Sequence, residues 1–361
     1  MIHISFFSGD ITRSGGTENV SVMIANELSQ KTDYEISFIS LFEERDIPFF
    51  SINPAIQRFR LYPTATHGIQ HYFDTCKRLR NIVATQHIDV LIDIDCILDM
   101  YSLPLRKTGV KVVSWEHFNY LQNPDVPYRR LTRRWAARSA DAIVTLTETD
   151  KKLYQSNLKL KCPIVAIPNP MEMPDSPASY DADSHLILSS GRLTYQKGFD
   201  LLVEVASKVL PGHPDWTWMI LGEGEDRPML EQKIRDAHLD GRLVLKGRVD
   251  DVDSYYRRSA MFVMTSRFEG LPMVLLEAKA HRLPLVSFDC PTGPAEIIED
   301  GVNGTLVPPG DVDSIAAAVN ELIESQAKRV EYSAMSGSNA NRYDINTIMQ
   351  NWIRILHEVT R

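Results

Sequence analysis

The chain of 361 residues has few cysteines, and none of them lies in a metal-binding or redox motif. The four cysteines are scattered along the sequence without a C-x-x-C pair: Cys76, Cys96, Cys162 and Cys290. Disulfide frameworks and cysteine zinc sites need paired or clustered cysteines. The sequence therefore favours a reducing compartment and offers no zinc signature.

An export signal and a membrane span are also missing. The first ten residues, MIHISFFSGD, lack the basic segment and the long apolar segment of a signal peptide. No uninterrupted apolar run is long enough to cross a bilayer. We therefore expect a cytoplasmic protein, with peripheral contact to the inner face of the cytoplasmic membrane left open.

Excess positive charge and the common nucleotide-binding motifs are absent as well. A formal net charge of -8 argues against nucleic acid as a partner. Neither G-x-G-x-x-G nor G-x-x-x-x-G-K-[ST] occurs, which weakens dinucleotide and P-loop interpretations. Asp93 and Asp95 form a D-x-D pair of the kind that holds divalent metals. Because the same spacing recurs around residues 181, 251 and 311, the pair has little specificity, and we expect neither a metal nor another cofactor.

The sequence does contain two successive runs of alternating strand and helix patterns. Hydrophobic residues make up 43% and charged residues 24%, as in ordinary globular proteins, and the length suits two domains. We expect strands at residues 2–7, 35–41, 90–95, 110–115, 142–146 and 164–167, and again at 186–189, 216–221, 243–245, 261–264 and 285–288. This α/β pattern predicts two doubly wound, Rossmann-like domains that face a central cleft, with ligands at the carboxyl ends of parallel strands.

The domain boundary is predicted in a segment rich in Pro, Ser and Asp. We expect an N-terminal domain over residues 1–170, a linker over 171–184 and a second domain over 185–340. Residues 345–359 place their apolar side chains on one helical face, and such a face must pack against something. We expect the segment 341–361 to return to the first domain.

The stretch SRFEGLPMVLLE places two acids around a predicted helix start. Glu269 precedes the helix and Glu277 lies inside it, while Pro272 suits a first helical position. Unpaired N–H groups at a helix start attract anions, so an anion site beside paired acids suggests a nucleotide sugar. A capping role for Glu269 and a solvated helical acid at Glu277 are equally compatible with this stretch alone.

Two glycine-containing loops follow the first predicted strand of each domain. Gly15, Gly16 and Glu18 lie in the first loop, where backbone N–H groups can approach a phosphate or a sugar. Arg192 and Lys197 lie in the second loop, GRLTYQKG, where a cation pair can hold a diphosphate leaving group. An ordinary turn and two solvated cations remain the alternatives for these loops.

His117 and a group of arginines complete the candidates in the first domain. His117 follows the strand that ends near Trp115, on the predicted cleft side, although a single histidine is more often structural. The arginines lie within one short segment and partly share a helical face: Arg129, Arg130, Arg133, Arg134 and Arg138. They suit anionic lipid head groups or an acidic acceptor, or form a solvated surface.

Together these motifs resemble the retaining glycosyltransferases of family 4, which have the GT-B architecture, and especially the amylovoran-type branch that builds exopolysaccharide, capsule or lipid-linked oligosaccharide. The matching segments run nearly end to end: G-G-x-E (15–18), S-W-E-H-F-N (114–119), I-P-N-P (167–170), G-R-L-x-x-x-K-G (191–198), F-E-G-L-P-x-V-L-L-E (268–277) and C-P-T-G-P-A-E-I-I-E-D-G-x-N-G (290–304). Two acids separated by seven residues are a weak motif, but the ordered set is specific.

The resemblance implies a role for each matched position. Arg192 and Lys197 would stabilise the charge of the leaving diphosphate, Glu269 would contact the transferred sugar, and Glu277 the ribose. His117 would lie near the anomeric centre, and Gly15 and Gly16 would shape the acceptor side. Further donor contacts are implied for two short backbone segments: Gly270, Leu271, Pro272 and Met273 beside the sugar or phosphate, and Gly247, Arg248 and Val249 beside the nucleobase.

The implied reaction is transfer of a hexose or N-acetylhexosamine from a UDP-sugar, with retention of configuration, to a saccharide linked to undecaprenyl diphosphate. A front-face route, in which a donor phosphate oxygen assists deprotonation of the acceptor, is the hypothesis for retention. A non-hydrolysing UDP-sugar epimerase of the same architecture is an alternative, and it would consume the donor without an acceptor. A two-lobed sugar-binding protein is disfavoured, because it would need neither Arg192 nor Lys197.

Overall fold

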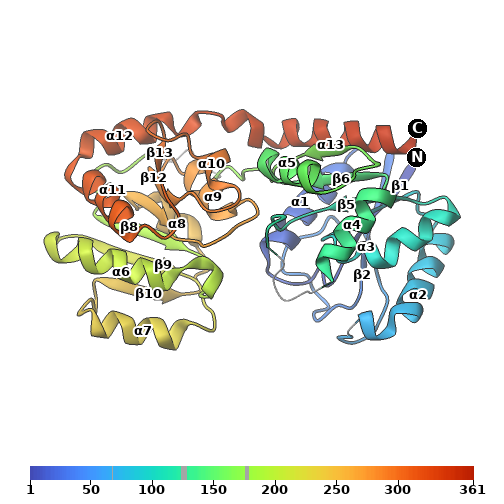
Figure 1. Ribbon diagram of the computed structural model, residues 1–361, viewed down its shortest axis with the longest axis horizontal. Helices are drawn as coiled ribbons and strands as arrows, with labels where there is room; N and C mark the ends of the chain where they lie inside the picture. The colour runs from blue at the N-terminus through green and yellow to red at the C-terminus, as the bar shows by residue number, and fades with distance from the viewer. Residues whose placement is uncertain (67, 123–127, 175–178) are drawn as a thin grey trace. The chain divides into compact units, whose positions relative to one another are not determined.

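The computed structural model describes residues 1–66, 68–122, 128–174 and 179–361, which form two α/β units (Figure 1). The first unit comprises Met1–Pro170 and Ile345–Arg361, and the second comprises Met171–Asp344. Part of the predicted linker, residues 175–178, lies outside the described residues. No helix in the described ranges is both long and apolar enough to cross a bilayer.

The first unit is built on a parallel sheet of seven strands in the order β3-β2-β1-β4-β5-β6-β7. The strands are β1 (Ile2–Ser8), β2 (Tyr34–Ser40), β3 (Gln57–Arg60), β4 (Val90–Ile94), β5 (Lys111–Trp115), β6 (Ala142–Thr145) and β7 (Ile164–Ala166). The central strand β4 is buried along its whole length, as expected for a parallel sheet covered on both faces.

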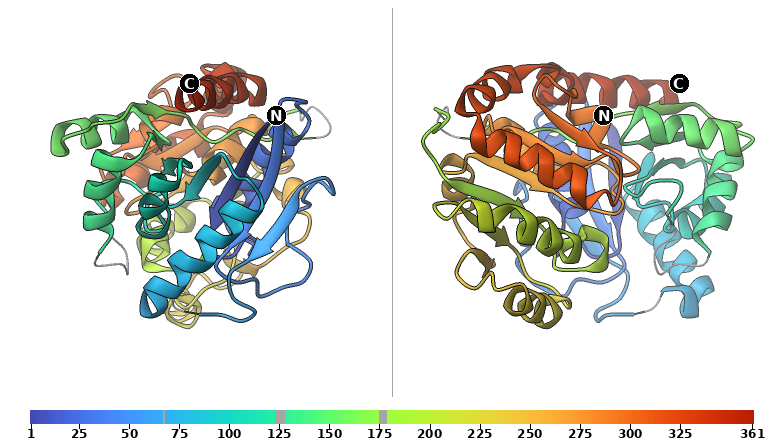
Figure 2. Two further views of the ribbon diagram at one scale, coloured as in Figure 1. Left: turned by 90° about the vertical axis from the view of Figure 1, so that its right-hand side faces the viewer. Right: turned by 60° about the vertical axis from the view of Figure 1, so that its left-hand side comes forward.

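Helices cover both faces of this sheet. They are α1 (Gly16–Ser29), α2 (Tyr72–Thr85), α3 (Asp99–Ser102), α4 (Arg129–Ser139), α5 (Glu148–Asn157) and α13 (Ile345–Thr360). On one face, Leu79 and Val83 of α2 pack with Phe7 and Leu91 of the sheet, and α2 is seen in front of the strands on the left of Figure 2. Ala136 and Ala137 of α4 pack with other strands on this same side. These helices therefore present their outer sides to solvent.

The C-terminal helix α13 packs on the opposite face of the first sheet. Its residue Trp352 is fully buried, and its ring meets the Trp115 ring of β5 edge to face, with centroids 4.7 Å apart. Such a contact adds about 0.5–1.5 kcal/mol to the burial itself. The expected return of the chain to the first domain is confirmed by this contact.

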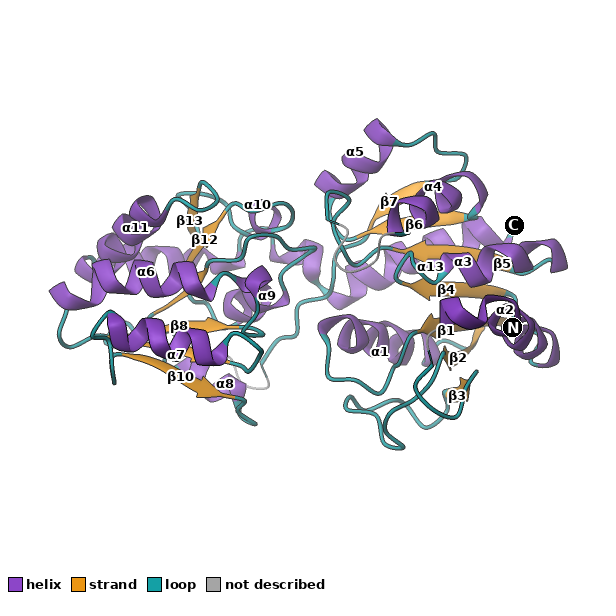
Figure 3. Cartoon of the chain, turned by 60° about the horizontal axis from the view of Figure 1, so that its bottom comes forward, coloured by secondary structure: helices purple, strands orange, loops and turns teal. Residues whose placement is uncertain are grey.

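The second unit contains a parallel sheet of six strands in the order β10-β9-β8-β11-β12-β13. The strands are β8 (Leu186–Ser190), β9 (Thr217–Leu221), β10 (Leu243–Gly247), β11 (Met261–Met264), β12 (Leu285–Phe288) and β13 (Gly304–Val307). The helices are α6 (Phe199–Val209), α7 (Arg227–Asp236), α8 (Val252–Arg257), α9 (Met273–Ala280), α10 (Pro294–Ile297), α11 (Val312–Glu324) and α12 (Gln326–Ala334). Helices α6 and α7 lie side by side over one face of the sheet (Figure 3), where their apolar residues share a core with α11.

Each sheet has a point at which the strand order reverses. The reversal lies between β1 and β4 in the first unit and between β8 and β11 in the second. At such a point the loops at the carboxyl ends of two neighbouring strands diverge to opposite faces, leaving room for a ligand. In the second unit these loops are residues 191–198, which carry the predicted cations, and 265–272, which carry the predicted acid Glu269. The expected architecture of two Rossmann-like domains is confirmed.

Candidate active site

The acidic stretch after β11 is held in place by backbone hydrogen bonds to the loop after β12. The Glu269 amide donates to the Pro291 carbonyl at 3.0 Å, and the Thr292 amide donates to the Glu269 carbonyl at 2.9 Å. Gly293 has φ +104, and a Cβ there would lie 2.7 Å from the carbonyl oxygen of Gly270, so a glycine is required. The turn that carries Glu269 is therefore fixed by the neighbouring loop after β12.

The start of α9 differs by one residue from the sequence prediction. Pro272 is the N-cap, with extended φ and ψ, and Met273 is the first helical residue. Pro272 was predicted as the first helical position, which is wrong by one place. Leu271 and Pro272 are buried, whereas Met273 and Gly270 are partly exposed at the helix start.

The carboxylate of Glu269 accepts hydrogen bonds from three side chains. Lys197 Nζ lies 2.6 Å from Oε1, and Ser266 Oγ donates to the same oxygen at 2.7 Å. Gln196 Nε2 donates to Oε2 at 3.3 Å. Glu269 is 6% exposed, so these partners replace the water it would otherwise bind. Two of the sequence candidates, Lys197 and Glu269, thus meet directly at the switch point of the second sheet.

The loop that carries Lys197 is anchored to the acidic stretch at two further points. Gly198 has φ +64, and a Cβ there would lie 2.1 Å from the Thr265 carbonyl oxygen. Arg267 forms a two-pronged ion pair with Asp200, at 2.8 and 2.6 Å, and its guanidinium also lies over the Tyr195 ring. Arg192 is exposed in the same loop. The loop therefore presents one fixed cation and one exposed cation.

Glu277 lies one turn before the end of α9 and is bound by a tyrosine from another helix. Tyr256 in α8 donates its hydroxyl to Glu277 Oε2 at 2.7 Å. Burial raises the pKa of Glu277, and the hydrogen bond from Tyr256 partly opposes this increase. The predicted segment Gly247, Arg248 and Val249 lies at the carboxyl end of β10, where Gly247 has φ +82 and Arg248 is exposed.

His117 lies in the first unit, in the loop after β5. It is 8% exposed, its ring packs against Trp115, and its Nε2 has no hydrogen-bond partner among the described residues. Burial lowers its pKa to about 3, which the nearby Glu116 only partly opposes. The imidazole is therefore neutral at physiological pH, and its buried Nε2 is left without a partner among the described residues.

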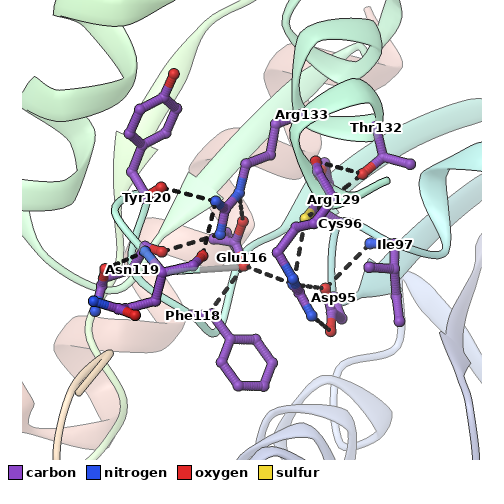
Figure 4. A network of polar contacts seen from close by, with 12 residues as sticks. Asp95, Cys96, Ile97, Glu116, Phe118, Asn119, Tyr120, Arg129, Thr132 and Arg133 are labelled. Carbon is purple, nitrogen blue, oxygen red and sulfur yellow. Dashed lines mark hydrogen bonds and ion pairs between the residues drawn. The ribbon is translucent and has the colours of Figure 1, made fainter. Parts of the chain in front are cut away.

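A buried polar network holds this loop (Figure 4). Arg133 Nε lies 2.6 Å from Glu116 Oε2, and its other nitrogens donate to the carbonyl oxygens of Asn119, Tyr120 and Gln122. The other Glu116 oxygen accepts from the Phe118 amide at 3.1 Å. Burial raises the pKa of Glu116, but the ion pairs with Arg133 and Arg129 outweigh it, so the carboxylate stays charged. The network fixes the backbone on both sides of His117.

The arginine segment must therefore be divided into two sets. Arg129 and Arg133 are 2% and 1% exposed, and their predicted contact with a membrane or an acceptor is wrong because both are buried in ion pairs with acids. Arg130 and Arg134 are exposed on the outer side of α4, together with Arg138. Helical spacing alone did not reveal which side of the segment faces the core.

A possible metal cluster coincides with these ion pairs. Asp95, Cys96 and Glu116 bring three potential ligand atoms within 4.8 Å of one another. Nη1 of Arg129 lies 2.5 Å from Asp95 Oδ1, 3.5 Å from Cys96 Sγ and 3.5 Å from Glu116 Oε1. The guanidinium already supplies a cation to all three groups. Asp93, the other half of the D-x-D pair, accepts a hydrogen bond from Ser102 instead.

The first glycine loop differs in kind from the second. Gly15 is the N-cap of α1 in an extended conformation, and Glu18 lies in the first turn of this helix. A Cβ on Gly15 would lie 2.1 Å from Glu18 Oε2, so the glycine makes room for this carboxylate. Gly16 is the first helical residue. A negative side chain thus lies against the helix start, where we expected a phosphate or a sugar.

Solved structures share this architecture. The chain aligns over 99% of its length with the outer-core galactosyltransferase WaaB, with TM-score 0.77 and 20% identity, covering 99% of that chain. It aligns equally well with HepE of Anabaena in complex with UDP, with TM-score 0.77 and 17% identity, covering 100% of that chain. The fold is therefore GT-B, the two-domain class of glycosyltransferases.

The sequence comparisons then define the family. Residues 14–173 match the model for Glycosyltransferase Family 4, and residues 175–340 match Glycosyl transferases group 1. An uncharacterised glycosyltransferase of Haemophilus influenzae is 32% identical, covering 99% of this chain and 100% of its own. The chain belongs to this glycosyltransferase family.

Two relatives have more specific names. The amylovoran biosynthesis glycosyltransferase AmsD of Erwinia amylovora is 29% identical over 96% of this chain and 97% of its own. A Campylobacter jejuni N-acetylgalactosaminyltransferase, named as acting on a saccharide linked to undecaprenyl diphosphate, is 25% identical over 99% of both chains. Both span the two units of the present protein.

Proposed function

We propose that this glycosyltransferase transfers a hexose or N-acetylhexosamine from a UDP-sugar to a growing, lipid-linked saccharide in bacterial surface polysaccharide synthesis. The UDP bound to HepE supports the donor, since that protein shares the fold. The names of the Erwinia and Campylobacter relatives support polysaccharide synthesis and the lipid-linked acceptor.

The contact between Lys197 and Glu269 is the observation that carries the proposal. An ammonium has three N–H donors, and the bond to Glu269 uses one of them. No other side chain in the described ranges accepts from the remaining two, which can bind a diphosphate together with the exposed Arg192 of the same loop. Glu269 lies beside this cation, and its carboxylate can accept hydrogen bonds from hydroxyls of the sugar. The bond that breaks joins the sugar to the UDP. The cation thus suits the leaving UDP, and the acid suits the sugar.

The proposed reaction retains the anomeric configuration by a front-face route. The acceptor oxygen forms a bond to the anomeric carbon as the bond from that carbon to the UDP oxygen breaks, and the acceptor proton passes to a donor phosphate oxygen. Lys197 and Arg192 stabilise the negative charge that develops on the UDP. This route needs no enzyme nucleophile, which agrees with the three hydrogen-bond donors that already engage Glu269.

The same proposal places the α4 surface against anionic lipid. Arg130, Arg134 and Arg138 are exposed, and α4 contains no acidic residue, although the whole chain has a net charge of -8. Leu131 is 63% and Trp135 36% exposed on the same helix. Exposed arginines beside an exposed leucine and tryptophan fit the head groups and the upper acyl region of a bilayer.

The first test is a thermal-shift panel of nucleotide sugars on the purified protein. A donor present at a hundred times its Kd should stabilise the fold by about 2.7 kcal/mol. The stabilising UDP-sugar is then incubated with and without a lipid-linked saccharide. Transfer that requires the acceptor supports the proposal. Conversion of the donor alone would favour the epimerase, and no stabilisation by any nucleotide sugar would overturn both.

A further inference from the structure

Glu277 is held by one oxygen and open at the other. Its Oε2 accepts from the Tyr256 hydroxyl at 2.7 Å, whereas Oε1 accepts no hydrogen bond from the described residues. Tyr256 is 1% exposed and comes from α8, 21 residues earlier in the sequence. A carboxylate with one oxygen fixed has a defined orientation, so its free oxygen faces a defined direction.

The Tyr256 ring itself packs against two other rings. It stacks on His281, with centroids 4.9 Å apart and planes 20° apart, and on Phe262 at 5.8 Å. His281 is positioned in turn, because its Nδ1 lies 2.8 Å from the Glu277 carbonyl oxygen. The hydroxyl of Tyr256 therefore has little freedom to leave Glu277.

Burial, the Tyr256 hydrogen bond and neighbouring charges together set the pKa of Glu277. Burial raises its pKa, and the Tyr256 hydrogen bond lowers it. Among the charged neighbours, Glu172 raises the pKa, while His281 and Lys197 lower it. Burial and the nearby Glu277 carboxylate raise the pKa of the Tyr256 phenol, so this hydroxyl remains a donor at physiological pH.

We propose that Tyr256 is a positioning residue for the nucleoside of the donor, which orients Glu277 so that its free oxygen receives the ribose hydroxyls. The inference rests on the proposed function, since it requires a nucleoside diphosphate donor. A cis-diol supplies two O–H donors, and the unoccupied lone pairs of the carboxylate accept them. Tyr256 also keeps Glu277 ionised, because a hydrogen bond to a carboxylate favours its charged form.

The test is the Tyr256→Phe variant, with UDP and 2′,3′-dideoxy-UDP as probes in isothermal titration calorimetry from pH 5 to 8. The variant should bind UDP about tenfold more weakly at pH 7, as expected for a lost hydrogen bond to a charged group. Both probes carry the same diphosphate, so the effect of its titration cancels in the ratio of the two Kd values. In the wild type, the preference for UDP should decline as the pH falls towards the Glu277 pKa, and in the variant this decline should begin at a higher pH.

Two further variants guard against a general loss of structure. Tyr180→Phe removes a hydroxyl that donates to the Ala260 carbonyl at 2.7 Å in the same unit, and it should leave the binding of UDP unchanged. If Tyr256→Phe does not fold, 3-fluorotyrosine at position 256 keeps the ring and provides a stronger donor. It should shift the decline to lower pH.

The two proposals fail in different ways. If the wild type does not bind UDP, the proposed donor is wrong, and the role of Tyr256 is overturned with it. If the wild type binds UDP but neither substitution at position 256 alters the Kd ratio or its pH dependence, Tyr256 is only structural, while the proposed function stands.

Discussion

The ammonium of Lys197 lies 2.6 Å from Glu269 Oε1, although 72 residues separate them in the sequence. Lys197 comes from the loop after β8 and Glu269 from the loop after β11, and these strands are neighbours at the point where the strand order reverses. The sheet topology, and not local sequence, creates this pair. It joins the expected phosphate-binding loop to the expected sugar-binding acid.

Replacing Lys197 with Ala should lower kcat by about a hundredfold or more, because in the proposed reaction this cation stabilises the leaving diphosphate. The measurement is steady-state turnover with saturating UDP-sugar and acceptor. Lys208→Ala is the matched control. Lys208 forms an ion pair with Asp313, and both side chains are at least half exposed. Turnover of Lys197→Ala close to that of the wild type would contradict the assigned role.

His117 should make the stability of the protein sensitive to acid. Its pKa is about 3 in the folded chain but about 6.5 when unfolded. The unfolded state therefore binds more protons between these values, so the contribution is complete above pH 6.5 and is lost as the pH falls. Below about pH 6 the loss should approach 1.4 kcal/mol per pH unit. Urea unfolding of His117→Gln and of the wild type, compared from pH 4.5 to 7.5, measures it; parallel profiles would refute it.

The strands of both sheets could largely be predicted from sequence, because strands that are buried on both faces are continuous apolar runs. Two edge strands could not. β3 consists of Gln57–Arg60, with three polar residues and no fully buried position. β13 has only four residues, Gly304–Val307, and begins at the glycine of an Asn-Gly pair. Edge strands bury less surface, so their sequences carry a weaker signal.

The site was predictable only where its residues lie in motifs. Lys197, Glu269 and Glu277 could be selected from their loops and from the family resemblance. Tyr256 could not, because nothing in the sequence around α8 indicates that its hydroxyl reaches Glu277. Ser266 was within reach of sequence reasoning, since it lies three residues before Glu269 and inside the same stretch.

The C-terminal end of α9 contains a residue whose replacement should stabilise the protein. Arg282 has φ +62, while the amides of Arg282 and Leu283 bond back to the carbonyls of Lys279 and Ala278, as in a Schellman motif. Arg282→Gly should raise the free energy of unfolding by about 1 kcal/mol, because glycine adopts this conformation without the Cβ clash. Urea denaturation measures the change. Gly241→Ala, at φ +73 in open space, should do the reverse, and equal effects of both would contradict the argument.

Chelation should leave the transferase active. Asp95 is paired with Arg129, and Asp93 is fully buried with one oxygen bound by Ser102, so we expect neither acid to hold a metal. Transfer in EDTA should therefore proceed at the rate seen without it. Activity that disappeared in EDTA and returned with manganese would show that the donor diphosphate needs a metal after all.

The outer side of α4 should govern binding to anionic membranes. Changing Arg130 and Arg134 to Glu replaces two exposed positive charges with negative ones, and near an anionic surface each arginine contributes about 1 kcal/mol. The double variant should no longer sediment with vesicles that contain anionic lipid, while its donor binding should be unchanged. Lys151→Glu and Lys152→Glu on α5 provide a control with the same change of charge. Unchanged sedimentation of the α4 variant would leave Arg130 and Arg134 as ordinary solvated surface.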